Sequence, residues 1–141
     1  MKAAKLVAVR QNGREVLLVR RCRDGRWMFP GGKRKRRRNE SLRGCLNREI
    51  REELPHVRID ACRLWLKLAG RNPFNGRKMS DAIFVPARVA GRLTIGAKDE
   101  IDMVAWCRPW RLALTPTSRF ICDLLLEAGY LMPRRTRTST S

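Results

Sequence analysis

Three glutamates stand close together in a sequence that is otherwise strongly basic. Glu49, Glu52 and Glu53 lie within the stretch NREIREELP, whereas the whole chain of 141 residues carries 32 Lys and Arg against 13 Asp and Glu. On a helix, which turns about 100° per residue, Glu49 and Glu53 share one face and Glu52 lies at its edge. Like charges at this spacing repel one another, so the pattern predicts a positive partner near the three carboxylates.

Two kinds of partner would suit this carboxylate stripe. One is the arginines of the same helix, such as Arg48 and Arg51, which would make the stripe a solvated helix surface. The other is a hard divalent cation, because Mg²⁺ takes oxygen ligands and commonly binds one or two carboxylates together with substrate phosphates. Two neighbouring features favour the cation. The preceding loop FPGGK lets backbone approach a ligand closely, and Glu40 stands eight residues before Arg48.

The order of these residues resembles the signature of the Nudix hydrolases. That signature places a glycine, five residues, a glutamate, seven residues, and then Arg-Glu, an aliphatic residue, any residue and Glu-Glu. Here Glu40, seven residues and the run REIREE at 48–53 reproduce its central part. The similarity covers roughly residues 3 to 131. It implies the α/β (α+β) fold of that family, an α/β/α sandwich in which a mixed β-sheet is flanked by helices.

The chain departs from that signature at two places. Seven residues, KRKRRRN, separate Gly32 from Glu40 where the signature has five, so we expect the Gly31 carbonyl to shift relative to the glutamates. Pro55 replaces the glycine that closes the helix, and His56 stands where an aliphatic residue is usual. Because proline also stops a helix, the second change is expected to affect geometry more than chemistry.

The resemblance implies Mg²⁺-dependent hydrolysis of a diphosphate (pyrophosphate) linkage in a nucleoside diphosphate derivative, with Mn²⁺ as the alternative ion. Phosphoryl chemistry of this kind needs charge neutralisation and an aligned water more than covalent help. Arg48 and Glu40 would hold the carboxylates through salt bridges, and Gly32 would be structural. Glu52 or Glu53 would also orient or deprotonate the water. The implied metal ligands are four oxygen donors: Glu49, Glu52, Glu53 and the Gly31 carbonyl.

Glu100, in the stretch DEIDMVAW, is a further candidate for the same site. The stretch resembles the segment where many family members place an additional acid on a loop near the metal. Glu100 would then be a ligand or a general base. The other interpretation is an exposed turn acid, because Asp99 and Asp102 make the whole segment acidic. Both interpretations stay open at this point.

The basic run Lys33–Arg38 also has two interpretations. It would extend a phosphate clamp or bind an RNA backbone beside the active site, since clustered Lys and Arg gain affinity by releasing counterions. Alternatively, it is a solvated loop without a ligand. Lys33 aligns with a lysine of the family, so Lys33 and Arg34 are the substrate-binding candidates.

The elements that must position these residues follow from turns, caps and hydrophobic periodicity. The helix of the carboxylates should begin after an N-cap at Ser41 and end at Pro55. A second helix should open at Thr115-Pro116, bury Ala128 among other apolar residues, and end at Gly129. The expected strands cover residues 6–10, 16–21, 57–70, 79–89 and 102–107, with a hairpin turn at Asn12-Gly13 and a hairpin loop at RNPFNGRK.

Composition bounds the class of protein. The net charge of +19 and a pI near 11.4 predict attraction to polyanions such as nucleotides and RNA. The five cysteines are widely spaced without a C-x-x-C pair, so a reducing, cytoplasmic location without zinc or disulfides is expected. No apolar run is long enough for a membrane span. We expect one domain over residues 1–132 and a flexible basic tail over 133–141.

Two alternatives to a hydrolase remain from the sequence. One is a catalytically weak RNA or nucleic-acid-binding module on the same fold, with its cationic surface as the function. The other is a basic interaction domain without a substrate. A hydrolase would bind a nucleotide or dinucleotide, and the oligomeric state is not predicted.

Overall fold

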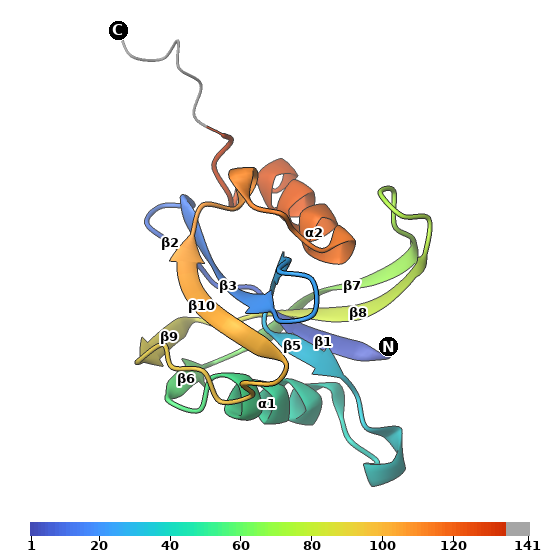
Figure 1. Ribbon diagram of the computed structural model, residues 1–141. Helices are drawn as coiled ribbons and strands as arrows, with labels where there is room; N and C mark the ends of the chain where they lie inside the picture. Colours follow the sequence, from blue (N-terminus) through green and yellow to red (C-terminus); the bar gives the residue numbers. More distant parts are fainter. Residues whose placement is uncertain (135–141) are drawn as a thin grey trace, which may run out of the picture.

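The computed structural model describes residues 1–134 and places its strands between two helices (Figure 1). The helices are α1 (Leu42–Glu53) and α2 (Pro116–Glu127). The first sheet has the order β5 (Gly31–Lys33), β1 (Ala3–Leu6), β8 (Lys78–Val85) and β7 (Arg63–Arg71). The second has the order β10 (Ile101–Cys107), β3 (Glu15–Arg21) and β2 (Val9–Arg10), with β4 (Trp27–Met28) also paired to β3. A third pairs β6 (Val57–Asp60) with β9 (Arg88–Gly91).

The first strand of the chain differs from the prediction. Residues 6–10 were expected to form one strand, but β1 ends at Leu6 and β2 begins at Val9, in a different sheet. The chain crosses between the sheets at two buried residues, because Val7 N donates to Phe84 O of β8 and Ala8 O accepts from the N–H of Leu17 in β3. The hairpin turn at Asn12-Gly13 is confirmed, since β2 and β3 are antiparallel.

Residues 57–70 also form two strands where one was predicted. Ala61 adopts a left-handed conformation (φ 50°) that breaks the run into β6 and β7. β6 then pairs with β9, whereas β7 forms the predicted hairpin with β8. The predicted strand over 79–89 is likewise interrupted after Val85, where Pro86 removes a backbone donor. The strand expected at 102–107 is confirmed as β10.

The segment FPGGK was predicted to be loop, but it contains the short edge strand β5. Gly31 and Gly32 pair antiparallel with Lys5 and Ala4 of β1. Gly31 has φ +139°, and an added Cβ there would lie 2.1 Å from the carbonyl oxygen of Ala4. Glycine therefore permits an approach to β1 that no other residue would allow.

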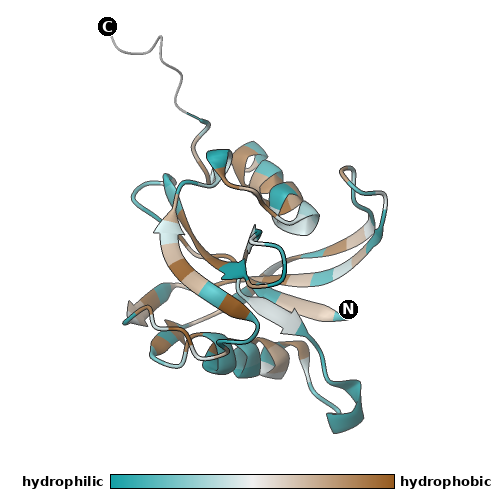
Figure 2. Cartoon of the chain, viewed as in Figure 1, coloured by the Kyte–Doolittle hydropathy of each residue, from teal (hydrophilic) through white to brown (hydrophobic). Residues whose placement is uncertain are grey.

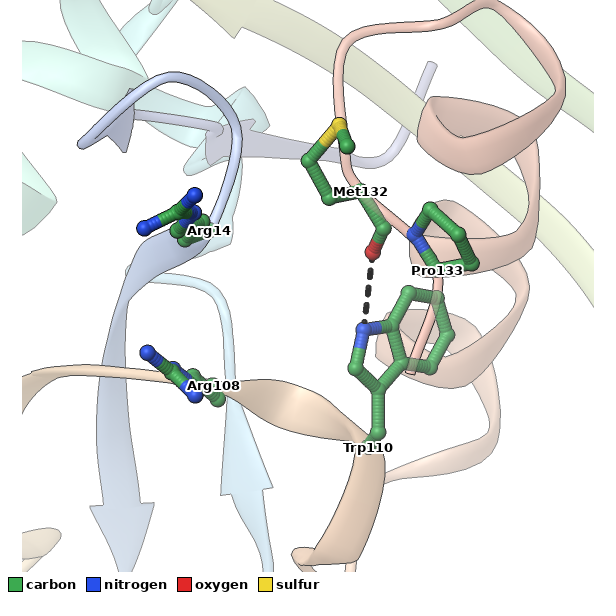
Figure 3. Close-up of a pocket in the computed structure, with 5 residues that line it drawn as sticks. All are labelled: Arg14, Arg108, Trp110, Met132 and Pro133. Atoms are coloured by element: carbon green, nitrogen blue, oxygen red, sulfur yellow. Dashed lines mark hydrogen bonds between the residues drawn. The ribbon is translucent and has the colours of Figure 1, made fainter. Parts of the chain in front are cut away.

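Helix α2 begins as predicted and ends slightly earlier. The Thr115 hydroxyl accepts from the N–H of Ser118, and Pro116 occupies the first turn. Ala128, expected to be buried, is exposed because it forms the C-cap, and Gly129 (φ +79°) follows it. Beyond the helix, the indole N–H of Trp110 donates to the carbonyl of Met132 at 3.0 Å (Figure 3). Most of the predicted tail, residues 135–141, lies outside the described residues.

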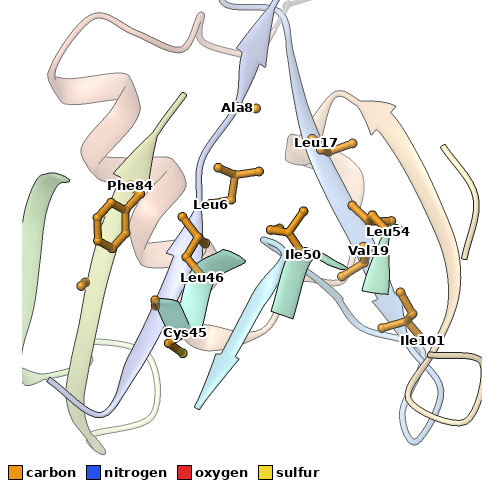
Figure 4. Packing of buried hydrophobic residues seen from close by; sticks show 12 residues of the cluster. Leu6, Ala8, Leu17, Val19, Cys45, Leu46, Ile50, Leu54, Phe84 and Ile101 are labelled. Atoms are coloured by element: carbon orange, nitrogen blue, oxygen red, sulfur yellow. The ribbon is translucent and has the colours of Figure 1, made fainter. Parts of the chain in front are cut away.

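The two faces of α1 have different surroundings. Its N-cap is Ser41, whose hydroxyl accepts from Gly44 N at 3.0 Å, and its last turn stops before Pro55, as predicted. Figure 2 shows the hydrophilic colouring of the loop that leads into this helix. The inner face packs into a core cluster with β1, β3 and β8 (Figure 4). Labelled members of this cluster are Leu6, Ala8, Leu17, Val19, Cys45, Leu46, Ile50, Leu54, Phe84 and Ile101.

This packing fixes which way the remaining face of α1 points. Burial of the apolar side chains holds the helix against β1 and β5. The carboxylates are thereby presented at the edge of the first sheet. No helix within residues 1–134 is both long and apolar enough to cross a membrane. The five cysteines, all inside this range, are free thiols.

Candidate active site

Arg48 is the centre of the candidate site. Its guanidinium donates to both carboxylate oxygens of Glu40, from Nε at 2.6 Å and from Nη2 at 3.1 Å. Nη1 donates to Glu49 Oε1 at 2.9 Å and to Glu52 Oε2 at 3.3 Å. Nη2 also donates to the carbonyl of Lys33 at 3.0 Å. One side chain therefore holds three carboxylates and the end of β5 together.

Glu40 fixes the loop before the helix. Its Oε1 accepts from the N–H of Lys35 at 2.9 Å in addition to the Arg48 guanidinium. The bond to Arg48, followed by the one to Lys35, lowers the pKa of Glu40 to about 2, so its carboxyl is ionised at neutral pH. The extra length of the loop is taken up by the short 3₁₀ helix η1 (Arg36–Arg38) and the left-handed Asn39 (φ 51°).

Glu53 is the buried acid of the site. Its side chain belongs to a residue that is only 2% exposed, and Oε1 accepts from Gly31 N at 2.9 Å. Burial raises the pKa of Glu53 to about 7, against the opposing effects of the Gly31 bond and the charge of Lys5. The negative charges of Glu49 and Glu100 raise this pKa further.

The N–H of Gly31 faces Glu53, and the strand pattern of β5 indicates the direction of its carbonyl. In an antiparallel pair, alternate residues direct their backbone N–H and C=O toward the partner strand and away from it. Arg34 N donates to Lys2 O, so even-numbered residues of this segment face β1. Gly31 and Lys33 therefore face outward. The hydrogen bonds of these two residues agree with this alternation, because Lys33 O accepts from Arg48 and Gly31 N donates to Glu53, and neither partner belongs to β1.

Gly32 allows Glu49 to lie against β5. An added Cβ at Gly32 would lie 2.5 Å from the carboxyl carbon of Glu49 and 2.6 and 2.7 Å from its two oxygens. The carboxylate thus occupies the space that a side chain would take. Burial raises the pKa of Glu49, while the Arg48 guanidinium opposes that shift. The side chain of Glu52, in contrast, is 47% exposed, which matches its predicted place at the edge of the stripe.

The structure brings Glu100 to the same place. It lies in the loop before β10, with its side chain exposed, and its charge raises the pKa of both Glu49 and Glu53. The nearby Asp102 differs, because both of its carboxylate oxygens accept from Arg20 at 2.8 and 3.1 Å. Of these two acids, Asp102 therefore belongs to a structural ion pair, whereas Glu100 is close enough to the carboxylates for its charge to act on them.

The donors at this site suit a hard divalent cation. The Glu49, Glu52 and Glu53 carboxylates and the outward-facing Gly31 carbonyl are all oxygen ligands, which Mg²⁺ prefers. Within residues 1–134, no three Asp, Glu, His or Cys side chains converge as a ready metal cluster. Arg48 holds Glu49 and Glu52 in this conformation. These four oxygen donors are therefore of the chemical type that binds Mg²⁺.

A cleft of about 820 Å³ adjoins the carboxylates at Gly32 and Lys33. Six cationic side chains line it, and five of them were not among the predicted site residues, Lys33 being the exception: Lys5, Arg21, Arg23, Arg26, Lys33 and Arg77. Lys33, a predicted substrate-binding residue, lies at this cleft, whereas Arg34 does not line it. A smaller cavity of about 150 Å³ lies between Arg14, Arg108 and Trp110 (Figure 3).

Arg48→Lys is expected to lower the free energy of unfolding by about 2 kcal/mol, because lysine loses the forked bonds to the largely buried Glu40 carboxylate. Urea unfolding of the metal-free protein measures this loss. The control is Arg51→Lys in the same helix, where an exposed arginine should change stability by less than about 0.5 kcal/mol. Equal losses in the two variants would contradict the role given to Arg48.

The raised pKa of Glu53 predicts how the stability of the metal-free protein depends on pH. Its pKa rises from 4.5 to about 7 on folding, so between these values the native state binds a proton that the unfolded state has released. The stability of the metal-free protein should therefore fall as pH rises from about 5 to 8, with a contribution of roughly 3 kcal/mol from this group. Unfolding of wild type and Glu53→Gln across this range isolates the contribution. Glu52→Gln should retain the wild-type slope, and an unchanged slope in Glu53→Gln would contradict the assignment.

Comparison with models of protein families identifies the family of this chain. A family model described as "NUDIX domain" matches residues 1–124. A search of curated protein sequences finds none that matches this chain.

Solved structures share the fold at low sequence identity. A MutT NUDIX hydrolase from Burkholderia pseudomallei is 23% identical, with a TM-score of 0.67 over 84% of this chain and 92% of that one. The NUDIX domain of Shewanella oneidensis NrtR, in complex with ADP ribose, is 17% identical, with a TM-score of 0.63 over 89% and 86% of the chains. An ADP-ribose pyrophosphatase from Streptococcus suis is 17% identical, with a TM-score of 0.56 over 95% of each chain.

Proposed function

This chain belongs to the NUDIX family of pyrophosphohydrolases, and from that premise we propose that it cleaves the diphosphate linkage of a nucleoside diphosphate derivative with a bound Mg²⁺. The observation that carries the proposal is the pairing of a buried Glu53 with the backbone of Gly31, beside Glu49. A carboxylate buried in this way costs free energy unless a ligand or partner uses it. A protein that binds no ligand at this site would bear the cost of burying the Glu53 carboxylate without a compensating interaction from a ligand.

Four oxygen donors would hold the ion: the Glu49, Glu52 and Glu53 carboxylates and the Gly31 carbonyl. When bound, Mg²⁺, or Mn²⁺ in its place, supplies neutralisation of the diphosphate charge and lowers the pKa of a bound water. The bonds from Arg48 to Glu40 and Glu49 keep the donors oriented before substrate arrives. Such orientation removes part of the entropic cost of reaching the transition state.

The chain's other groups would align the water and the substrate. Glu52 and Glu100 are exposed carboxylates at the rim, and either can accept a proton from a water molecule that approaches phosphorus. Glu53, which is buried, would act on that water only through its ligand position. Lys33 lines the cleft beside the carboxylates, where its ammonium would bind a phosphate oxygen.

The names of the similar structures support a nucleoside diphosphate derivative as the substrate class. One of those structures holds ADP ribose, and another is named an ADP-ribose pyrophosphatase. ADP-ribose is therefore the first compound to test. The cleft beside the carboxylates gives a substrate of this class room to bind.

A substrate panel tests the proposal. The protein is incubated with Mg²⁺ and, separately, with ADP-ribose, nucleoside triphosphates, dinucleoside polyphosphates and 5′-triphosphorylated RNA, and products are resolved by chromatography. We expect cleavage between phosphates for at least one compound, with ¹⁸O from water in one product and loss of activity in EDTA. Calorimetric titration with Mg²⁺ should also show tighter binding to wild type than to Glu49→Gln. Failure to cleave any compound with either Mg²⁺ or Mn²⁺ would reject the proposal.

A further inference from the structure

The cationic cleft extends well beyond the carboxylates. We use this name for the 820 Å³ cleft lined by Lys5, Arg21, Arg23, Arg26, Lys33 and Arg77. Asp24 and Asp81 are the acids that line it, and Asp24 is bonded to Arg21 through both oxygens. Arg23 and Arg77 form no ion pair within residues 1–134. The cleft therefore keeps an excess of positive charge.

A second group of cations continues from Lys33. The arginine loop, residues 33–38, leaves β5 and projects from the body of the structure (Figure 1). Its backbone is held at its start, because Arg34 N donates to Lys2 O and Lys35 N donates to Glu40, and its last turn is closed by the bond from Asn39 N to Arg36 O at 3.0 Å. Its side chains form no ion pair inside the described range, and η1 buries none of its residues. An ordered backbone thus presents a row of free positive charges.

An aromatic ring stands at the cleft as well. Phe74, in the loop between β7 and β8, lines the cleft and is 44% exposed. Its N–H donates to the side chain of the buried Asn72 at 2.8 Å, and the Arg119 guanidinium lies 4.6 Å from its ring centroid. The ring is therefore held in place beside the cations. Stacking of unpaired bases on aromatic rings is a common feature of single-strand binding sites.

We propose that the cationic cleft and the arginine loop together bind the phosphate backbone of a single-stranded nucleic acid. The two surfaces meet at Lys33, so a strand that follows both would pass beside the carboxylates. A mononucleotide would need only the charges near the carboxylates, whereas these cations also occupy the rest of the cleft and the arginine loop. The exposed ring of Phe74 favours an unpaired strand over a duplex. RNA and DNA share this chemistry, and binding does not depend on the proposed hydrolysis.

Fluorescence anisotropy with labelled oligonucleotides of roughly twelve nucleotides tests this surface. Binding is measured in EDTA, so the result is independent of hydrolysis, and KCl is varied from about 50 to about 300 mM. The test variant replaces Arg36, Arg37 and Arg38 with Gln. The control replaces Arg58, Arg63 and Arg92 with Gln, which removes the same charge from exposed positions that belong neither to the lining of the cleft nor to the arginine loop. Circular dichroism verifies that both fold.

We expect the arginine-loop variant to bind RNA about tenfold more weakly, and its slope of log affinity against log salt to fall by about 2. The control variant should change affinity by less than about twofold. Equal losses in the two variants would overturn the proposal, because they would reflect net charge alone. Wild-type binding without salt dependence would overturn it as well.

Two further arms identify the ligand. Phe74→Ala should weaken single-strand binding by about fivefold or more, with little effect on duplex binding. Equal affinity for RNA and DNA of one sequence would assign the surface to the shared phosphate backbone, and tighter RNA binding would assign it to RNA. Duplex bound as tightly as single strand would contradict the single-strand proposal.

Discussion

Glu53→Gln is expected to lower kcat for diphosphate hydrolysis by about a thousandfold or more, the scale at which a positioned catalytic carboxylate acts. The amide keeps the oxygen that accepts from Gly31 N, so the local packing is preserved while the negative charge is lost. The kcat of the best substrate in the panel measures this loss. Weaker Mg²⁺ binding in calorimetry should accompany it, because the amide is a poorer ligand than a carboxylate.

Loss of folding cannot account for this result if stability is measured beside activity. Burial raises the pKa of Glu53 to about 7, so the neutral amide removes a buried charge above that pH. The metal-free variant should therefore be at least as stable as wild type at pH 8. Glu127→Gln, at the exposed end of α2, should leave kcat unchanged. Retention of more than about a tenth of wild-type activity in Glu53→Gln would contradict the assigned role.

Local patterns predicted the helix of the site with its caps and its faces. Ser41 and Pro55 bound α1, and the helical period placed Glu49 and Glu53 on one face with Glu52 at its edge. The exposed fractions follow that order, because Glu53 is almost fully buried and the side chain of Glu52 is half exposed. A helix face depends on spacing along the chain, which sequence contains directly.

Crossings between sheets were not predictable in the same way. The apolar stretch around Val7 and Ala8 reads as one strand, since both of its halves are apolar and both pair. The break at Ala61 occurs without a glycine or proline, and it separates β6, which pairs with β9, from β7, which pairs with β8. β5 was missed because two glycines normally indicate a turn.

The cationic cleft illustrates a site that only the fold assembles. Arg21 and Arg26 flank the turn between β3 and β4, and Arg77 comes from the loop before β8. The segment RNPFNGRK, which contains Arg77, was predicted as a hairpin loop, yet nothing in its local sequence relates it to Arg21 or Arg26. The hydrogen bonds between Glu40 and Arg48 were predicted, although local spacing alone does not indicate them. Glu40 precedes the helix, so helical spacing does not predict the pair, and the family resemblance did.

Gly31→Ala is expected to lower the free energy of unfolding by more than about 3 kcal/mol, or to prevent folding. The added Cβ would lie 2.1 Å from Ala4 O and 2.9 Å from the Cα of Lys5, both of them backbone atoms of a central strand. Neither can move without displacing β1 from β8. Alanine at φ +139° would also be strained.

The matched control for Gly31→Ala is Gly70→Ala. Gly70 also has a positive φ (+82°), but an added Cβ there meets nothing within 4 Å. Its substitution should cost only the conformational strain, about 1 to 2 kcal/mol. Urea unfolding of both variants separates strain from collision. Similar losses would show that β5 is free to move away from β1, and the Gly31 backbone would then not be fixed beside Glu53. A Gly31→Ala protein that fails to fold while Gly70→Ala folds normally supports the close approach of β5 to β1, on which the position of that backbone depends.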